Sequence, residues 1–271
     1  MRYLILLTAL ILPGVLASPS MACGAQSHCK VEGGYYLVDL PKDWDGSSPL
    51  GLVVYFHGWN GSPEGTFRNK AMVNGVTRRG AMFVAPFART GYWRQIGEGR
   101  AEGGRNEAAY IRAVTADVQK RWPVDTTRTL ASGFSRGASM VWNVACYTGD
   151  LFAGYAPIAG GFWGSTPENC LTGPVNLRHI HGLSDNVVAY DEVGVYNSMP
   201  IPDGMKMLRR MNGADDIADQ TYRLEHPKRP LSCERYIGTS GKALETCLHP
   251  RGHSIPAEWV ADELDWLMSL E

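Results

Sequence analysis

Apolar residues follow two alternating patterns along this chain. Short, nearly continuous apolar runs are typical of strands that are covered on both faces, and they alternate with stretches whose apolar residues recur at helical spacing. The runs predict strands at 35–40, 50–58, 81–86, 127–134, 152–160, 174–182, 221–226 and 243–250. The amphipathic stretches predict helices at 107–122, 136–146, 203–213 and 255–270. This order predicts an α/β fold with a mostly parallel central sheet and helices on both faces.

The first 22 residues have a different character from the rest. A single Arg2 precedes an apolar run, Pro13 and Gly14 break the run, and small residues follow. This layout predicts a secretory signal peptide over 1–22, because the run is short for a membrane span. Cleavage after Ala17 or after Ala22 fits equally. We therefore expect one catalytic domain over 23–271 in an exported protein, either extracellular or periplasmic.

Composition excludes some function classes. Hydrophobic residues make up 44% of the chain and charged residues 20%, which fits a globular protein with a full core. The formal net charge is −1 and no run of Lys or Arg stands out, so the basic footprint of a nucleic-acid-binding protein is missing. The chain also carries no sequence motif for a metal or a nucleotide, so no cofactor is expected.

All six cysteines follow the predicted signal peptide. An even number of cysteines in an exported chain predicts disulfides. Cys23 directly follows Ala22 and is also a candidate for a lipid anchor. Ser20, however, stands three residues before Cys23, where a lipidation site would have an apolar residue. A Cys23–Cys29 disulfide is therefore the favoured expectation.

The segment Gly133-Phe134-Ser135-Arg136-Gly137 lies between a predicted strand and a predicted helix. With 31 glycines in the chain, the pentapeptide alone is weak evidence, so its setting decides. A Gly-x-Ser-x-Gly segment at a strand-to-helix turn is the position of the nucleophile in serine hydrolases of α/β type. Ser135 is therefore the candidate nucleophile.

A serine nucleophile needs a base and a carboxylate that orients the base. Asp185 and His253 each follow a predicted strand, in the chain order Ser, Asp, His. They are the candidate acid and base, since ligands of such sheets bind beyond the carboxyl ends of the strands. His179 and His181 precede the acid and are expected to pack in the core or to orient the loop. The less suitable alternatives are Asp191, His226 and His249.

The segment His57–Ser62 follows the second predicted strand and contains a His-Gly turn. Such turns supply main-chain N–H groups to an oxyanion hole in esterases. We assign the two donors to the main chains of Trp59 and Arg136, the latter because it follows the nucleophile. His57 is expected to hold the loop rather than to transfer a proton.

These segments together resemble the secreted α/β-hydrolase esterases that are grouped with polyhydroxybutyrate depolymerases and feruloyl or acetylxylan esterases. The similar pieces are VVYFHGWNGS, GFSRGASMVWNVAC, LFAGYAPIAG, LRHIHGLSDNVVAY and RGHSIP, which spread over 50–256. The resemblance implies the α/β-hydrolase fold, with nucleophile, acid and base at Ser135, Asp185 and His253. It also implies the disulfides Cys146–Cys170 and Cys233–Cys247.

The function that follows is ester hydrolysis through an acyl-enzyme, on a small-molecule or polymer ester. Short-chain, polyhydroxyalkanoate and plant-cell-wall feruloyl or acetyl esters all fit. Aromatic side chains could line the cleft or could equally be core packing: Trp59, Trp93, Phe162 and Trp163. Two other functions stay open, a serine peptidase of prolyl-oligopeptidase type and a non-catalytic binding protein on a hydrolase scaffold.

Overall fold

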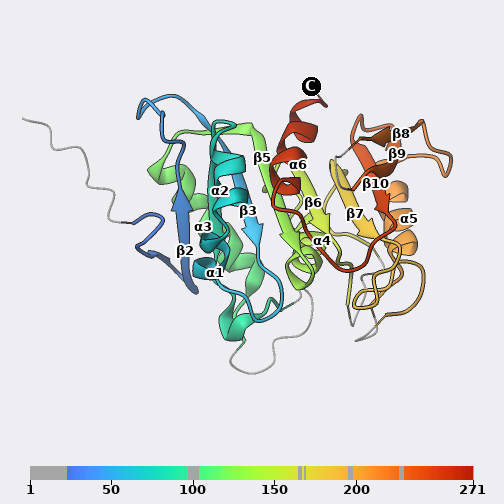
Figure 1. The fold of residues 1–271 in the computed structure, drawn as a ribbon, viewed down its shortest axis with the longest axis horizontal. Coiled ribbons are helices and arrows are strands. Elements are labelled where there is room, and N and C mark those ends of the chain that lie inside the picture. Colours follow the sequence, from blue (N-terminus) through green and yellow to red (C-terminus); the bar gives the residue numbers. More distant parts are fainter. Residues whose placement is uncertain are drawn as a thin grey trace, which may run out of the picture.

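The computed structural model describes residues 23–94, 96, 104–163, 167, 169–194, 198–225 and 229–270. The predicted signal peptide lies outside this described part of the chain. Figure 1 shows one twisted sheet with helices on both of its faces. The predicted α/β architecture with a mostly parallel sheet is therefore confirmed.

The sheet has ten strands in the order β1-β2-β4-β3-β5-β6-β7-β10-β9-β8. Its central strands, from β4 to β10 in this order, run parallel, and the outer strands pair antiparallel. The strands are β1 (Cys29–Val31), β2 (Gly34–Asp39), β3 (Leu50–Phe56), β4 (Ala81–Pro86), β5 (Val124–Phe134), β6 (Gly154–Ile158), β7 (Leu177–Gly182), β8 (Gln220–Leu224), β9 (Leu231–Ile237) and β10 (Ala243–His249).

Helices cover both faces of the sheet and bury every residue of β3, β4, β6 and β7. Within β3, Leu52 and Val54 face one hydrophobic core while Val53 and Tyr55 face the other. The first core includes residues of α3, α4 and α5, and the second includes residues of α1, α2 and α6. The helices are α1 (Pro63–Arg68), α2 (Lys70–Thr77), α3 (Glu107–Arg121), α4 (Arg136–Tyr147), α5 (Ile201–Asn212) and α6 (Trp259–Met268).

The short strand β1, the helices α1 and α2, and strand β9 are absent from the sequence-based expectation. The helices α1 and α2 are only 6 and 8 residues long, too short to display a helical repeat clearly. Ser62 nevertheless caps α1 by accepting the N–H of Gly65, and Pro63 stands at its start. Strand β9 largely alternates buried and exposed residues, a period of two that is typical of a strand and could have predicted it.

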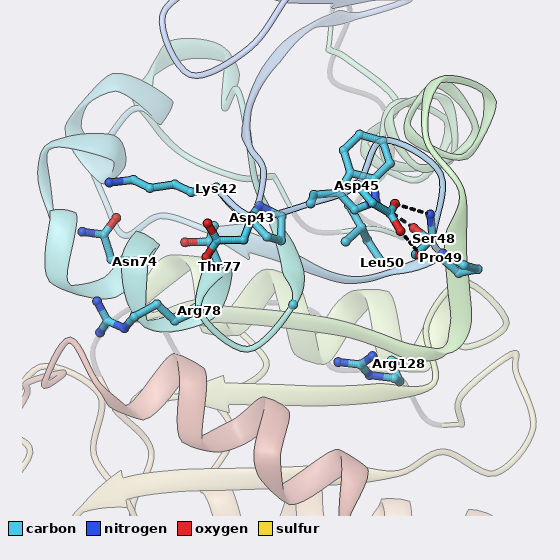
Figure 2. A pocket seen from close by; sticks show the side chains of 13 residues that line it. Lys42, Asp43, Asp45, Ser48, Pro49, Leu50, Asn74, Thr77, Arg78 and Arg128 are labelled. Atoms are coloured by element: carbon cyan, nitrogen blue, oxygen red, sulfur yellow. Dashed lines mark hydrogen bonds between the residues drawn. The ribbon is translucent and has the colours of Figure 1, made fainter.

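The parallel arrangement brings the carboxyl ends of β3, β5, β7 and β10 to the same edge of the sheet (Figure 1). The opposite edge holds a cavity of about 710 Å³ beside the amino end of β3, lined by Lys42, Asp43, Arg78 and Arg128 among others (Figure 2). None of the candidate catalytic residues lines that cavity.

Disulfides join Cys23 to Cys29, Cys146 to Cys170, and Cys233 to Cys247. These are the pairs that the sequence favoured and that the resemblance implied. The last of them joins directly opposed residues of β9 and β10.

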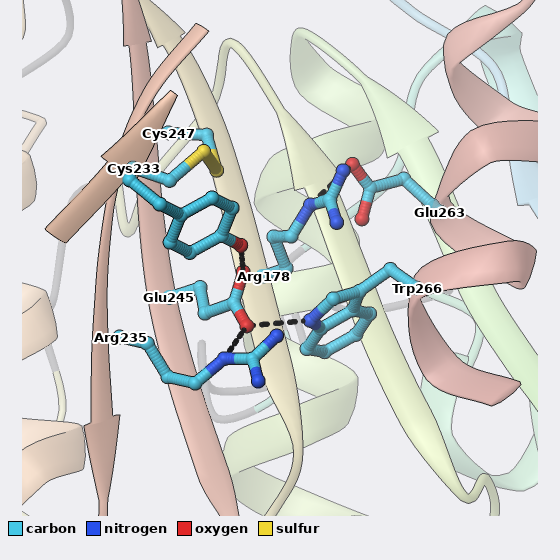
Figure 3. Close-up of a disulfide and its surroundings, with 8 residues drawn as sticks. Arg178, Cys233, Arg235, Glu245, Cys247, Glu263 and Trp266 are labelled. Atoms are coloured by element: carbon cyan, nitrogen blue, oxygen red, sulfur yellow. Dashed lines mark hydrogen bonds and ion pairs between the residues drawn. A yellow bond between two sulfur atoms is a disulfide. The ribbon is translucent and has the colours of Figure 1, made fainter. Parts of the chain in front are cut away.

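Buried charges lie beside the β9–β10 disulfide (Figure 3). Glu245 of β10 accepts the indole N–H of Trp266 at 2.8 Å and pairs with Arg235. Arg178 of β7 pairs with Glu263 of α6 at 3.1 Å.

Among the helices within the described residues, none is long and apolar enough to cross a lipid bilayer.

Candidate active site

Ser135 stands between the last residue of β5 and the first residue of α4. Its backbone has φ 57° and ψ −122°, a conformation that residues with a side chain rarely adopt. The two flanking glycines make the turn sterically feasible. A Cβ on Gly133 would lie 2.7 Å from the carbonyl carbon of Gly137, and a Cβ on Gly137 would overlap the carbonyl oxygen of Phe56. The Gly-x-Ser-x-Gly segment is therefore a strained strand-to-helix elbow.

Asp185 and His253 lie in the loops that follow β7 and β10. Nδ1 of His253 donates to Oδ2 of Asp185 at 2.7 Å, and Oδ1 of Asp185 accepts the N–H groups of Val187 and Val188, each at 2.9 Å. The ring of His253 packs against Phe134, which directly precedes Ser135, at 4.7 Å between centroids. The fold thus gathers the three candidate residues at one edge of the sheet and leaves Nε2 of His253 for another partner.

The electrostatic environment keeps the acid ionised. Burial raises the pKa of Asp185, but the hydrogen bonds from His253, Val188 and Val187 outweigh burial, and the net pKa lies below its ordinary value. A carboxylate held in this way fixes the orientation of the neighbouring imidazole ring. This pair can accept and return a proton at Nε2 of His253.

The loop after β3 lies directly beside the elbow. A Cβ on Gly58 would lie 3.6 Å from the Cβ of Ser135. Nδ1 of His57 donates to the Gly58 carbonyl at 2.9 Å, and burial lowers the pKa of this histidine, so it is neutral near pH 7. These contacts give His57 a loop-holding position, and Trp59 follows Gly58 in this loop. Arg136 is the first residue of α4, so its N–H is one of the groups that a helix leaves without an intrahelical partner.

Two buried histidines stand behind the acid. Nε2 of His181 lies 2.9 Å from the carbonyl oxygen of Val188 and 3.6 Å from Oδ2 of Asp185. Nδ1 of His181 in turn contacts Nε2 of His179 at 2.9 Å. Burial lowers the pKa of both rings, so both are neutral. They orient the Asp185 loop from within the core, as expected for histidines that precede the acid along the chain.

None of the alternative acid and base residues within the described part of the chain forms a carboxylate–histidine pair like that of Asp185 and His253. Asp191 is exposed and accepts no hydrogen bond from the described residues around the elbow. His249 is buried in β10, its Nδ1 accepts the N–H of Arg251 at 3.2 Å, and burial lowers its pKa to about 4. His226 lies outside the described residues.

The four candidate substrate-binding aromatics differ sharply in exposure. Trp59 is 61% exposed, whereas Trp93 and Phe162 are each 1% and Trp163 is 7% exposed. Trp93 donates its indole N–H to the His57 carbonyl at 2.9 Å, and the guanidinium of Arg136 lies 4.6 Å from the ring of Trp163. The three buried rings therefore have packing partners that support the elbow. Only Trp59 offers an open face for direct substrate contact.

The functional groups at this edge of the sheet are a hydroxyl, an imidazole, a carboxylate and main-chain N–H groups. They suit a reaction in which a hydroxyl attacks a carbonyl carbon and negative charge develops on its oxygen. No cluster of three or more metal-binding side chains was found within the described ranges.

No protein-family model matches the chain. The chain is 25% identical over 186 residues to a probable feruloyl esterase C of Aspergillus niger, a match that covers 66% of this chain and 64% of that protein. It is 27% identical over 187 residues to feruloyl esterase C of Emericella nidulans, with 66% and 64% covered. These matches span slightly less than two thirds of the relatives' own lengths.

Among solved structures, the acetyl xylan esterase from Aspergillus awamori matches with a TM-score of 0.63. The sequence identity is 16%, and the match covers 88% of this chain and 95% of that one. At this identity the structural match establishes the fold alone. The sequence similarity is to the fungal feruloyl esterases. The chain therefore has the fold of this acetyl xylan esterase, and over part of its length it is similar in sequence to feruloyl esterase C.

Proposed function

We propose that this protein hydrolyses carboxylic esters through a Ser135–His253–Asp185 triad and an acyl-enzyme intermediate. The observation that carries the proposal is the 2.7 Å hydrogen bond between His253 and Asp185 at the edge of the sheet where Ser135 forms its strained elbow. A buried carboxylate that orients a histidine toward a serine has the arrangement that serine hydrolases require.

In the first step, Nε2 of His253 takes the hydroxyl proton of Ser135 as Oγ attacks the ester carbonyl carbon. Asp185 stabilises the imidazolium that forms. The main-chain N–H groups of Trp59 and Arg136 donate to the oxyanion of the tetrahedral intermediate. When the intermediate collapses, His253 gives its proton to the departing alcohol. Water, activated by His253, then attacks the acyl-enzyme and releases the acid.

The relatives named feruloyl and acetylxylan esterases support plant-cell-wall esters as substrates, with short-chain and polyhydroxyalkanoate esters as the other members of the proposed range.

Three disulfides fit a protein that matures in an oxidising compartment. We propose that the protein is exported after removal of a signal peptide within residues 1–22, by cleavage after Ala17 or after Ala22. N-terminal sequencing of the exported protein tests this, and a chain that still begins at Met1 would contradict it.

The decisive variant is Ser135→Ala, assayed with p-nitrophenyl acetate, methyl ferulate, acetylated xylan, hydroxybutyrate oligomers and a peptide anilide. Loss of the nucleophile should lower kcat by about 10⁴- to 10⁶-fold. A fluorophosphonate probe should label the wild type and the Ser269→Ala control but not Ser135→Ala. Preferential cleavage of the anilide would instead identify a peptidase. A folded protein without turnover or labelling would be a binding protein.

The role of Asp185 is tested separately with Asp185→Asn. Asparagine retains an oxygen for the N–H groups of Val187 and Val188 but turns an amide toward His253, which then holds the unfavourable tautomer. The equivalent change in Ser-His-Asp enzymes costs about 10⁴-fold in kcat. Asp191→Asn is the matched control, since Asp191 is exposed six residues along the same segment. Equal turnover of the two variants would remove Asp185 from the mechanism.

A further inference from the structure

Trp93 contacts both chain segments that carry the proposed oxyanion donors. Its side chain is 1% exposed, and it follows η1 (Arg89–Gly91), the short 3₁₀ helix after β4. The indole N–H of Trp93 donates to the carbonyl of His57 at 2.9 Å, and both groups are buried. The Trp93 carbonyl accepts Nε of Arg136 at 2.8 Å. One residue thus joins the loop after β3 to the first residue of α4.

The carbonyl that the indole binds belongs to a part of the loop that packs against the nucleophile elbow. A Cβ on Gly137 would lie 2.6 Å from the carbonyl oxygen of His57. A Cβ on Gly58, the next residue of the loop, would lie 3.6 Å from the Cβ of Ser135. The start of the loop is therefore bonded to the indole and packed against the elbow at the same time.

The hydrogen bonds of this loop also fix the direction of the proposed donor on Trp59. In a trans peptide the C=O and N–H groups point in opposite directions, so a bond that holds a carbonyl also aims the N–H of the next residue. Trp93 holds the His57 carbonyl, and Nδ1 of His57 holds the Gly58 carbonyl at 2.9 Å. The second bond aims the N–H of Trp59, and the first keeps His57 in place to make it.

A buried ion pair keeps the segment around Trp93 in position. Arg105 and Glu107 pair at 2.6 Å, and their side chains are 4% and 2% exposed. Arg105 donates to the carbonyl of Phe87 at 2.8 Å, and its guanidinium lies 5.8 Å from the centre of the Trp93 ring. Glu107 accepts the main-chain N–H of Arg94. Both ends of this segment are therefore tied to residues at the start of α3.

Stabilisation of an oxyanion depends on the position of its donors. Loss of one donor costs about 10²- to 10³-fold in kcat, and a displacement of about 1 Å can cost about 10²-fold. The two proposed donors, on Trp59 and Arg136, stand on separate chain segments, so the local backbone does not set their spacing. A residue that bonds to both segments can set it, and Trp93 does so from a buried position.

We propose that Trp93 is a positioning residue that sets the spacing of the two oxyanion donors through its bonds to His57 and Arg136. This role rests on the proposed ester hydrolysis and adds to it a residue outside the triad and the oxyanion hole. Because its ring is buried, Trp93 acts through these neighbours rather than by contact with the ester.

The first test is Trp93→Phe, which retains a buried ring and loses the indole N–H. We expect kcat for p-nitrophenyl acetate to fall about 10- to 100-fold with little change in KM, because the donors shift relative to the developing oxyanion. Trp266→Phe is the matched control: Trp266 is 3% exposed, and its indole bond of 2.8 Å goes to Glu245 near the amino end of β10 (Figure 3). The control should lose stability but retain turnover. Equal turnover of the two variants would overturn the proposal.

A second measurement reports on the oxyanion hole itself. The Ser135 hydroxyl adds to the carbonyl carbon of a trifluoromethyl ketone, its proton passes to His253, and the carbonyl oxygen becomes an oxyanion. The inhibition constant of this ketone should rise in Trp93→Phe by about the factor by which kcat/KM falls, since both depend on binding that oxyanion. An unchanged inhibition constant beside a lower kcat would place the defect elsewhere and contradict the role. A higher KM at constant kcat would mean that the ring contacts the substrate, which also contradicts it.

Two further variants keep the proposal testable if Trp93→Phe does not fold. Benzothienylalanine at position 93 has the shape of tryptophan with a sulfur atom in place of the N–H, and it should show the same loss of kcat. Arg136→Met removes the other bond of Trp93 and should also lower kcat. Combined, the losses at positions 93 and 136 should amount to less than the product of the separate losses, because both disturb one spacing. A full product would show two independent effects and contradict the shared role.

Failure of this role differs from failure of the proposed function. If turnover depends on Ser135 but Trp93→Phe retains it, only the role of Trp93 is wrong. If the folded wild type neither cleaves an ester nor reacts with a fluorophosphonate, the proposed function is wrong, and the role of Trp93 is wrong with it.

Discussion

Ser135 combines a reactive hydroxyl with a backbone conformation that costs about 1–3 kcal/mol. The surrounding main chain holds it in place: its N–H donates to the carbonyl of Ile158, and its carbonyl accepts the N–H of Ser139, both at 3.0 Å. The glycines at 133 and 137 allow β3, β5 and α4 to approach closely enough for this turn. The two glycines of the motif are therefore required for steric reasons. The strained turn that presents the Ser135 hydroxyl could not form without them.

Replacing Gly137 with alanine should therefore damage both stability and turnover. The new Cβ would overlap the Phe56 carbonyl, so the elbow and β3 must separate, at a cost of about 1–3 kcal/mol in unfolding free energy. Urea denaturation and steady-state turnover measure the two effects. Gly173→Ala is the control, because a Cβ at Gly173 meets no atom within 4 Å. Equal stability of the two variants would show that the close packing at Gly137 is dispensable.

At the level of helices and strands, the disulfides differ in how far apart along the chain their partners lie. Cys146 lies at the last turn of α4, and its partner Cys170 lies in the loop before β7. This bond closes a sequence separation of 24 residues, whereas Cys23–Cys29 closes only 6. The longer loop loses more conformational freedom in the unfolded state when it is closed.

We expect removal of Cys146–Cys170, as the double alanine variant, to cost more stability than removal of Cys23–Cys29. Chain entropy predicts about 3 kcal/mol for the longer loop and about 2 kcal/mol for the shorter one. Denaturation of each double variant beside the wild type measures both losses. The reverse order would mean that packing around the sulfur atoms, rather than loop closure, determines the contribution of each bond.

At the scale of the whole molecule, α6 closes one face of the sheet and places an ionisable group inside it. Glu263 is fully buried, opposite Arg178 of β7 (Figure 3). Burial raises its pKa from 4.5 to about 7; Arg178 opposes this rise, and the nearby Glu245 adds to it. The folded protein therefore retains a proton on Glu263 between these two values, while the unfolded chain has lost it.

Stability from this group is consequently present at low pH and lost as the pH rises toward 7. Glu263→Gln, which imitates the protonated form at every pH, should remove that loss. Relative to the wild type, the variant should gain stability between pH 5 and pH 7.5, on the order of 1–3 kcal/mol by urea denaturation. Glu225→Gln, at an exposed glutamate, should follow the wild-type profile. Parallel profiles for Glu263→Gln and the wild type would contradict the prediction.

Much of the architecture is predictable because strands buried on both faces leave continuous apolar runs. The runs at β3, β4 and β7 and the helical spacing in α3 and α4 predict these elements to within a few residues of their observed ends. The short helices α1 and α2 contain too few residues for a repeat. Strand β9 is absent from the prediction although its alternation is readable. A hydrophobic pattern reflects how a segment is buried, and a segment of only a few residues is too short to show one.

The order of the elements and the chain order of Ser135, Asp185 and His253 can be read from the amino-acid sequence alone, since both depend on local composition and on neighbours along the chain. The folded chain was needed to establish that β5, β7 and β10 end at one edge, that His181 contacts the loop of Asp185, and that Trp59 is exposed while Trp93 is buried. Those properties depend on strand order and on contacts between residues distant in sequence, which no local pattern encodes.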